Sequence, residues 1–161
     1  MIIIPISPSS QQVAEQLAAS YTEATIHSYK DFTEETFCSA KQLVFIGALG
    51  ICVRTIAPFV EDKHSDPAVV CIDSTKRFVI AVLSGHVGGA NALATDLAHF
   101  LGAEPVVTTQ SDNTQLWALD TLPQQYGWTL RAANSNAAIA AFVNQQPTAL
   151  LLDVRNQGTD Y

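Results

Sequence analysis

Residues 84–91 read Ser-Gly-His-Val-Gly-Gly-Ala-Asn, and they join an apolar β-rich run, Phe78 to Leu83, to an apolar run with helical spacing, Ala90 to Leu101. Three glycines within five positions let the backbone turn sharply and approach a ligand closely, because glycine has no Cβ. The first N–H groups of the following helix point toward the turn, where the helix dipole favours negative charge. We therefore expect a strand, then a turn that forms part of an active or binding site, and then a helix. Glycines that only permit close packing would explain the turn equally well.

The pattern of strands and helices around this turn predicts the fold class. Apolar β-rich runs alternate with runs of helical spacing, which indicates an α/β fold. The serine and basic residues between Val69–Asp73 and Phe78–Leu83 favour a hairpin. We expect a three-layer sandwich with a mostly parallel sheet and one antiparallel hairpin. The other expected strands are 2–6, 24–28, 43–46, 104–107, 128–130 and 149–152, and the other expected helices are 9–19, 32–40, 47–58, 116–126 and 134–143.

Three polar or glycine-rich turns, at residues 47–50, 84–91 and 108–112, each follow the end of an expected strand. In open α/β sheets ligands bind outside the carboxyl ends of strands. We therefore expect the three turns to share one edge of the sheet. We expect residues 1–120 to form an N-terminal α/β domain with the candidate site, and residues 121–161 to begin a middle region that can pack on the same domain.

Composition and motifs exclude several classes of function. The chain has 161 residues, 48% hydrophobic and 14% charged, and a formal net charge of −7, which argues against nucleic acid or an anionic membrane as a partner. No apolar run approaches the ~20 residues that span a bilayer. The Walker and dinucleotide fingerprints are absent. The four histidines and three cysteines show no ligand spacing, so no metal site is expected. The cysteines indicate buried reduced thiols, which fit a cytoplasmic protein.

Two segments carry the candidate catalytic residues. His86 stands within the glycine turn, and because histidine exchanges protons near neutral pH, it is the candidate general base. Residues 62–67 supply Asp66, which would orient a histidine, and Lys63, which would hold a carboxylate. A structural histidine and a solvated loop are the alternatives.

The remaining candidates would bind substrate through backbone N–H groups, polar side chains or charge: Gly47, Gly50, Arg54, Ser84, Gly85, Gly88, Gly89, Asn91, Thr108, Thr109 and Asp112. Helix capping explains the asparagine, threonine and aspartate residues almost as well. Arg54 is equally well explained as a solvated surface charge. Ser84 and His86 do not form a recognisable nucleophilic pair, because the Gly-x-Ser-x-Gly elbow is absent.

Five blocks of sequence, in the same order, strongly resemble the N-terminal part of the cobalt-precorrin-5A hydrolase family (cobalamin biosynthesis protein CbiG). The resemblance covers roughly residues 43–120, and the family's usual Thr-Thr-Ala-Thr-Asp is here Thr-Thr-Gln-Ser-Asp at 108–112. Complete members also carry a C-terminal domain, so we expect this chain to be a fragment or one piece of a larger protein. The blocks are residues 47–54, 56–58, 62–63 with 66–70, 83–91 and 105–109.

The resemblance implies that the ring A δ-lactone of cobalt-precorrin-5A is opened and acetaldehyde is released, a step in the anaerobic route to cobalamin (vitamin B12). His86 would activate water, and the N–H groups around Gly88 and Gly89 would stabilise the oxyanion. The substrate would be a cobalt-containing tetrapyrrole, and no cofactor is expected because cobalt arrives within the substrate. The absent C-terminal domain would be a partner, so we expect this chain alone to supply half of a cleft, to bind weakly, and to turn the substrate over slowly or not at all. The oligomeric state stays open. A non-catalytic corrinoid-binding module and a generic anion-binding module are the alternatives.

Overall fold

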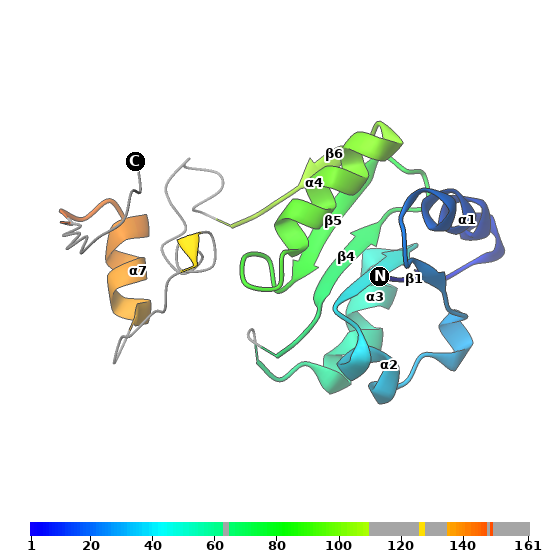
Figure 1. Ribbon diagram of the computed structural model, residues 1–161, viewed down its shortest axis with the longest axis horizontal. Coiled ribbons are helices and arrows are strands. Elements are labelled where there is room, and N and C mark those ends of the chain that lie inside the picture. Colours follow the sequence, from blue (N-terminus) through cyan, green and yellow to red (C-terminus); the bar gives the residue numbers. More distant parts are fainter. Residues whose placement is uncertain (63–64, 110–125, 128–134, 148, 150–161) are drawn as a thin grey trace.

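A computed structural model describes residues 1–62, 65–109, 126–127, 135–147 and 149 of the chain (Figure 1). The strands are β1 (Ile2–Pro5), β2 (Thr25–Ile26), β3 (Gln42–Ile46), β4 (Ala68–Ile72), β5 (Phe78–Leu83) and β6 (Glu104–Val106). The α-helices are α1 (Gln11–Ser20), α2 (Glu34–Ser39), α3 (Leu49–Ile56), α4 (Ala90–Leu101) and α7 (Ser135–Val143). The elements expected from the sequence are confirmed to within two residues wherever they fall in these ranges. Those expected over 116–126, 128–130 and 149–152 lie wholly or mostly outside the described residues.

The strands form one sheet in the order β2-β1-β3-β4-β5-β6. All neighbouring pairs are parallel except β4 and β5, which are antiparallel. The hairpin predicted from the sequence is therefore confirmed. The register shows the reversal directly, because Ile72 at the end of β4 pairs with Ile46 at the end of β3 and with Val79 near the start of β5.

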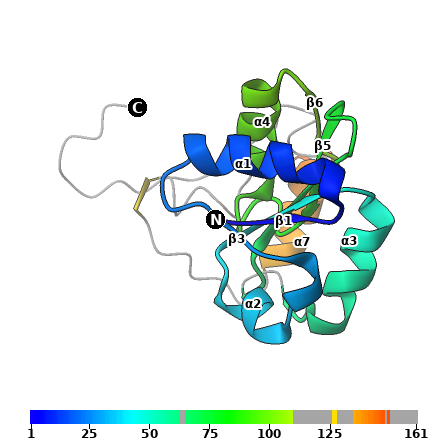
Figure 2. The same ribbon diagram turned by 90° about the vertical axis from the view of Figure 1, so that its right-hand side faces the viewer.

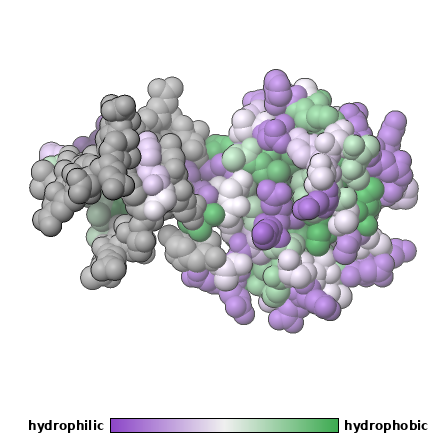
Figure 3. Space-filling view, in the orientation of Figure 1, coloured by the Kyte–Doolittle hydropathy of each residue, from purple (hydrophilic) through white to green (hydrophobic). Residues whose placement is uncertain are grey.

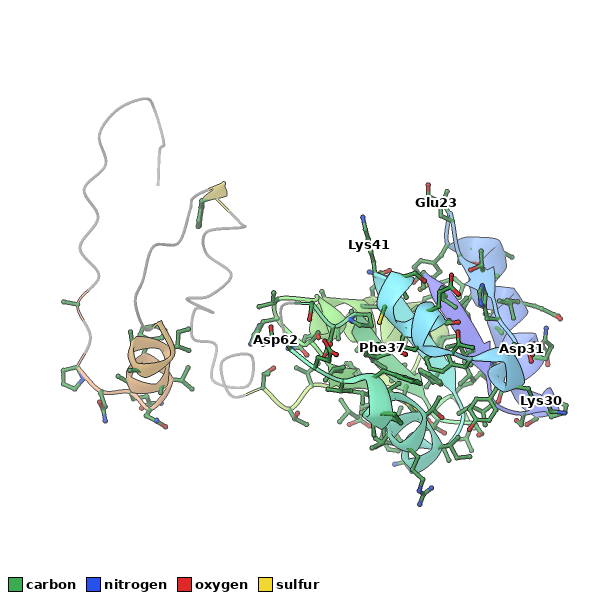
Figure 4. All side chains as sticks on the ribbon, turned by 90° about the horizontal axis from the view of Figure 1, so that it is seen from below. Glu23, Lys30, Asp31, Phe37, Lys41 and Asp62 are labelled. Atoms are coloured by element: carbon green, nitrogen blue, oxygen red, sulfur yellow. The ribbon has the colours of Figure 1, made fainter. Side chains whose placement is uncertain are left out.

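Helices cover both faces of the sheet, so the expected three-layer α/β sandwich is confirmed. Helices α1 and α4 lie on one face, and α2 and α3 lie on the other (Figure 2). The first face buries a core that includes Leu17 and Leu97, and the second buries Phe37 and Cys52. Phe37 points into the protein interior in Figure 4, whereas the labelled charged side chains lie at the periphery. Each such fully buried apolar side chain contributes ~1.5–3 kcal/mol through its removal from water.

The boundaries of α4 follow from the residues at its ends. Gly89 at the N-cap and Gly102 at the C-cap both have left-handed backbone conformations, with φ of 84° and 66°. The N–H of Gly102 donates to the carbonyls of Ala98 and His99, which closes the last helical turn. The helix thus begins directly at the glycine turn and returns the chain across the sheet to β6.

The cysteines only partly match the expectation of three buried thiols. Cys52 and Cys71 are buried, but Cys38 is exposed. The preceding Phe37 points into the core from the short helix α2, and the next residue of a helix is rotated by ~100°, which turns Cys38 toward solvent.

The surface of the described residues mixes polar and apolar side chains. Figure 3 shows hydrophobic residues interspersed among hydrophilic ones on the face in view. Within the described part of the chain, no helix is long and apolar enough to cross a membrane.

Candidate functional site

The glycine turns lie at two opposite edges of the sheet, which corrects the expectation that they share one. We call the edge where β3 and β4 end the Gly47 edge, and the edge where β5 and β6 end the His86 edge. The antiparallel β4–β5 pair reverses the chain, so the carboxyl end of β5 lies where β3 and β4 begin. At ~3.3 Å per residue, the five-residue strand β4 separates the edges by roughly 15 Å.

The Gly47 edge holds three of the predicted binding residues. The N–H of Gly47 donates to the carbonyl of Ile72 at 2.8 Å, which holds the turn after β3 against the end of β4. Arg54 reaches back along α3, where its Nη1 donates to the carbonyl of Gly50 at 3.4 Å. Gly47, Gly50 and Arg54 therefore do not line the same edge as His86, and a role for them in binding stays a prediction.

The turn of residues 84–91 closes on itself at the His86 edge (Figure 1). The N–H of Ala90 donates to the carbonyl of Ser84 at 3.2 Å, and that of Asn91 to the carbonyl of Gly85 at 3.1 Å. The N–H of Gly89 donates to the carbonyl of His86 at 3.1 Å. The expectation that these first helical N–H groups face a ligand is therefore wrong. The turn itself occupies them, and the N–H of Gly89 is no donor for an oxyanion.

Gly88 is the donor position that remains compatible with the oxyanion role. Among the described residues, no hydrogen bond engages its N–H group. Its backbone lies against Ser84, since a Cβ at residue 88 would stand 2.5 Å from the Ser84 Cβ and 2.8 Å from the Ser84 carbonyl oxygen. Only glycine fits this close approach.

Ser84 connects the glycine turn to the segment before β4. It is buried, and its φ of 55° places a non-glycine residue in the left-handed region. Its hydroxyl donates to the carbonyl of Asp66 at 3.1 Å. Ser84 thus holds the backbone together, which agrees with the absence of a nucleophile elbow in the sequence.

Asp66 is brought to the His86 edge, as the sequence suggested, but its carboxylate contacts the backbone of its own loop. Both carboxylate oxygens accept from the N–H of Glu61, at 3.2 and 3.1 Å. The residue is 8% exposed. These contacts order the loop that enters β4, where Asp62 is seen in Figure 4. A role for Asp66 in orienting a histidine stays a prediction.

Asn91 and Thr109 meet at this edge, although they lie in separate segments. The Nδ2 of Asn91 donates to the Oγ1 of Thr109 at 2.7 Å. This contact joins the start of α4 to the segment after β6, where Thr108 also lies. The capping explanation for Asn91 and Thr109 does not account for this side-chain contact.

His86 is half-buried within the closed turn, directly after Gly85 and two residues before Gly88 in the sequence. The described part of the His86 edge therefore brings together His86, Asp66, Ser84, Gly85, Gly88, Gly89, Asn91, Thr108 and Thr109. Lys63 and Asp112, two further predicted site residues, lie outside the described residues.

One cation at this edge was not found from the sequence. The carbonyl of Lys41 accepts from the N–H of Ala68 at 3.0 Å, so Lys41 stands just before the amino end of β3, beside the segment that carries Asp66 into β4. Its side chain projects from the protein in Figure 4. A reader of the sequence could find it only by knowing that β3 begins where β5 ends.

The described residues do not indicate a metal site, and Cys52 is not a candidate nucleophile. They contain no cluster of three histidine, cysteine, aspartate or glutamate side chains that could hold a metal ion. The hydrogen bond to Cys71, together with burial, raises the pKa of the Cys52 thiol far above its ordinary value. Cys52 therefore stays protonated and is a poor nucleophile.

Comparison with known proteins identifies the relatives of this chain. The family described as "Cobalamin synthesis G N-terminal" matches residues 31–112, and the one described as "Cobalamin biosynthesis central region" matches residues 117–161. A cobalt-precorrin-5A hydrolase from Salmonella typhimurium is 53% identical over 97 residues, which cover 60% of this chain and 28% of the relative. One from Priestia megaterium is 44% identical over 116 residues, covering 71% of this chain and 31% of the relative. The chain thus spans less than a third of the length of these curated relatives.

A crystal structure supports the same relationship at the level of the fold. The solved structure of a cobalamin biosynthesis protein G homologue from Sulfolobus solfataricus has a TM-score of 0.59 and 30% sequence identity. The similarity covers 66% of this chain and 36% of that one. The first family match alone spans slightly more than half of the sequence and contains the described residues of the His86 edge. The chain therefore belongs to the cobalamin synthesis G family, whose N-terminal domain it carries.

Proposed function

We propose that this chain takes part in the hydrolysis of the ring A lactone of cobalt-precorrin-5A, with release of acetaldehyde, in anaerobic cobalamin biosynthesis. The observation that carries the proposal is the match of the cobalamin synthesis G N-terminal family to residues 31–112, which include the whole closed turn and Thr109. The two curated relatives with 53% and 44% identity are both named cobalt-precorrin-5A hydrolase. The substrate is a tetrapyrrole that brings its own cobalt, and the site uses no separate cofactor.

The proposed reaction begins with water at the His86 edge. His86 takes a proton from water as the oxygen adds to the lactone carbonyl, and the N–H of Gly88 stabilises the negative charge that develops on the carbonyl oxygen. The carbon–oxygen bond of the lactone then breaks, leaving a carboxylate and an alcohol. Loss of the alcohol proton forms a carbonyl, breaks the adjacent carbon–carbon bond and releases acetaldehyde, while the electron pair remains on the macrocycle and takes up a proton.

A generic anion-binding module fits the geometry less well than this reaction. The N–H groups of Ala90 and Asn91 at the start of α4 donate to carbonyls of the turn, so they are not directed at an anion. A corrinoid-binding module without catalysis differs from the proposal only in turnover. Measuring binding and turnover on the same protein therefore distinguishes both alternatives from the proposed reaction.

The test combines thermal unfolding with an anaerobic assay. A cobalt corrinoid should raise the thermal midpoint of the purified protein, and a nucleotide should not, because only a ligand of the native state stabilises it. Incubation with cobalt-precorrin-5A should release acetaldehyde when the chain is supplied together with the C-terminal domain of its family, and little or none without that domain. Stabilisation without acetaldehyde would favour the binding module, and stabilisation by the nucleotide alone would overturn the proposal.

A further inference from the structure

Asn91 contacts two segments that follow different strands. Its side-chain Nδ2 donates to Thr109 Oγ1 at 2.7 Å, across a sequence separation of 18 residues. Its backbone N–H donates to the carbonyl of Gly85 at 3.1 Å. The first turn of α4 is thereby fixed to the turn after β5 and to the segment after β6.

The amide of Asn91 also packs directly on the glycine turn. A Cβ at residue 85 would stand 2.7 Å from Asn91 Oδ1, closer than real Cβ contacts, and a tight 3.1 Å from Nδ2. Gly85 is therefore the neighbour that makes room for the amide, one residue before His86. The position of the amide and the path of the turn depend on each other.

We propose that Asn91 is a positioning residue for His86, and that it acts through its hydrogen bond to Thr109. This inference rests on the proposed function, in which His86 is the base. It revises the expectation that Asn91 and Thr109 each bind substrate. The bond holds the His86 turn and the end of β6 as one surface, and a misplacement of ~1 Å in such an arrangement can cost ~10²-fold in rate.

The Asn91–Thr109 hydrogen bond can be removed by changing either residue, and a conservative change at Thr109 keeps it. Asn91→Ala removes the donor, Thr109→Val removes the acceptor while keeping the shape of the side chain, and Thr109→Ser keeps the hydroxyl. Asn91→Ala and Thr109→Val should each lower kcat by ~10- to 10²-fold with KM little changed. The double variant should be no slower than the slower single variant, because both changes break the same bond. Thr109→Ser should retain near-parental kcat.

A second measurement does not depend on the reaction. Amide hydrogen exchange of residues 85–89, measured without substrate, should be faster in Thr109→Val than in the parent and unchanged in Thr109→Ser. Equal exchange in all three proteins would overturn the inference whatever the activity. Losses that add in the double variant, or a raised KM in each single variant, would assign separate substrate contacts and would also overturn it. The exchange difference in a protein that releases no acetaldehyde would support the bond and contradict only the proposed function.

Discussion

The hydroxyl of Ser84 donates a 3.1 Å hydrogen bond to the backbone carbonyl of Asp66, and both residues are buried. The bond links the end of β5 to the loop that enters β4, so the closed glycine turn and the acidic loop are held at the same edge of the sheet. Ser84 itself sits at a φ of 55°, a conformation that costs a non-glycine residue energy. The hydrogen bond helps to hold it there.

Ser84→Ala should destabilise the protein by ~1–3 kcal/mol, because the buried carbonyl of Asp66 loses its donor. Chemical denaturation of the variant and the parent measures the difference. A stability equal to that of the parent would mean that water or another group replaces the hydroxyl at no cost.

In the complete enzyme, with the C-terminal domain present, His86→Ala should leave the fold intact and lower acetaldehyde release by ~10²–10⁴-fold, the usual contribution of a positioned base. His99→Ala is the matched control, because His99 is exposed in the last turn of α4, away from the glycine turn. Near-parental turnover in the His86 variant would remove this residue from the mechanism.

Gly88→Ala and Gly50→Ala should change stability in opposite directions. A Cβ at residue 88 would stand 2.8 Å from the carbonyl oxygen of Ser84, so this variant should lose ~1–3 kcal/mol and much of its activity. At residue 50, within α3, the nearest atom would be Arg54 Nη1 at 3.8 Å, and alanine should stabilise the helix by ~0.5–1 kcal/mol. Thermal unfolding of both variants compares them, and equal losses would contradict the packing argument.

For a corrinoid bound at the His86 edge alone, Arg54→Ala should leave the affinity unchanged at low and at high salt, because Arg54 reaches toward Gly50 at the Gly47 edge. Lys63→Ala, next to Asp62 in the sequence, should weaken binding at low salt and less at high salt, since ions screen contacts to carboxylates. Binding titrations at two ionic strengths make the comparison. A salt-dependent loss in the Arg54 variant would place ligand at the Gly47 edge instead.

The free energy of unfolding of the protein should fall at alkaline pH as Tyr21 loses its proton. Burial, with the Tyr21 hydroxyl hydrogen-bonded to Asp96, raises the pKa of Tyr21 from 10.0 to about 12. The folded state thus holds this proton more tightly than the unfolded state, so the stabilisation is complete below about pH 10 and is lost as pH rises toward 12. The stability difference between the parent and Tyr21→Phe should shrink over this window in urea titrations at stepped pH. A constant difference would contradict the assignment.

Much of the candidate site could be anticipated from local sequence. The glycines of residues 84–91 predicted a tight turn between β5 and α4, and they place His86 within it, because backbone freedom is a property of the residues themselves. The sequence predicted substrate binding by Asn91 and Thr109, with helix capping as the alternative, and neither includes their mutual hydrogen bond, since a pattern of neighbours along the chain contains no information on a contact across 18 residues. Lys41 was missed for the same reason.

The sequence by itself determined the elements and their kinds. Periodicity and turn chemistry act over a few residues, so β3, the β4–β5 hairpin and α4 could all be predicted from the residues they contain. Only the tertiary structure decided which turns meet. The direction of each strand depends on its pairing with a neighbour, and the single antiparallel pair places Gly47 and His86 at opposite edges. The same pairing brings Asp66 to Ser84 and leaves Asn91 beside Thr109. Pairing is a contact between distant segments, and the hydrogen bonds and packing that select it form only as those segments come together during folding.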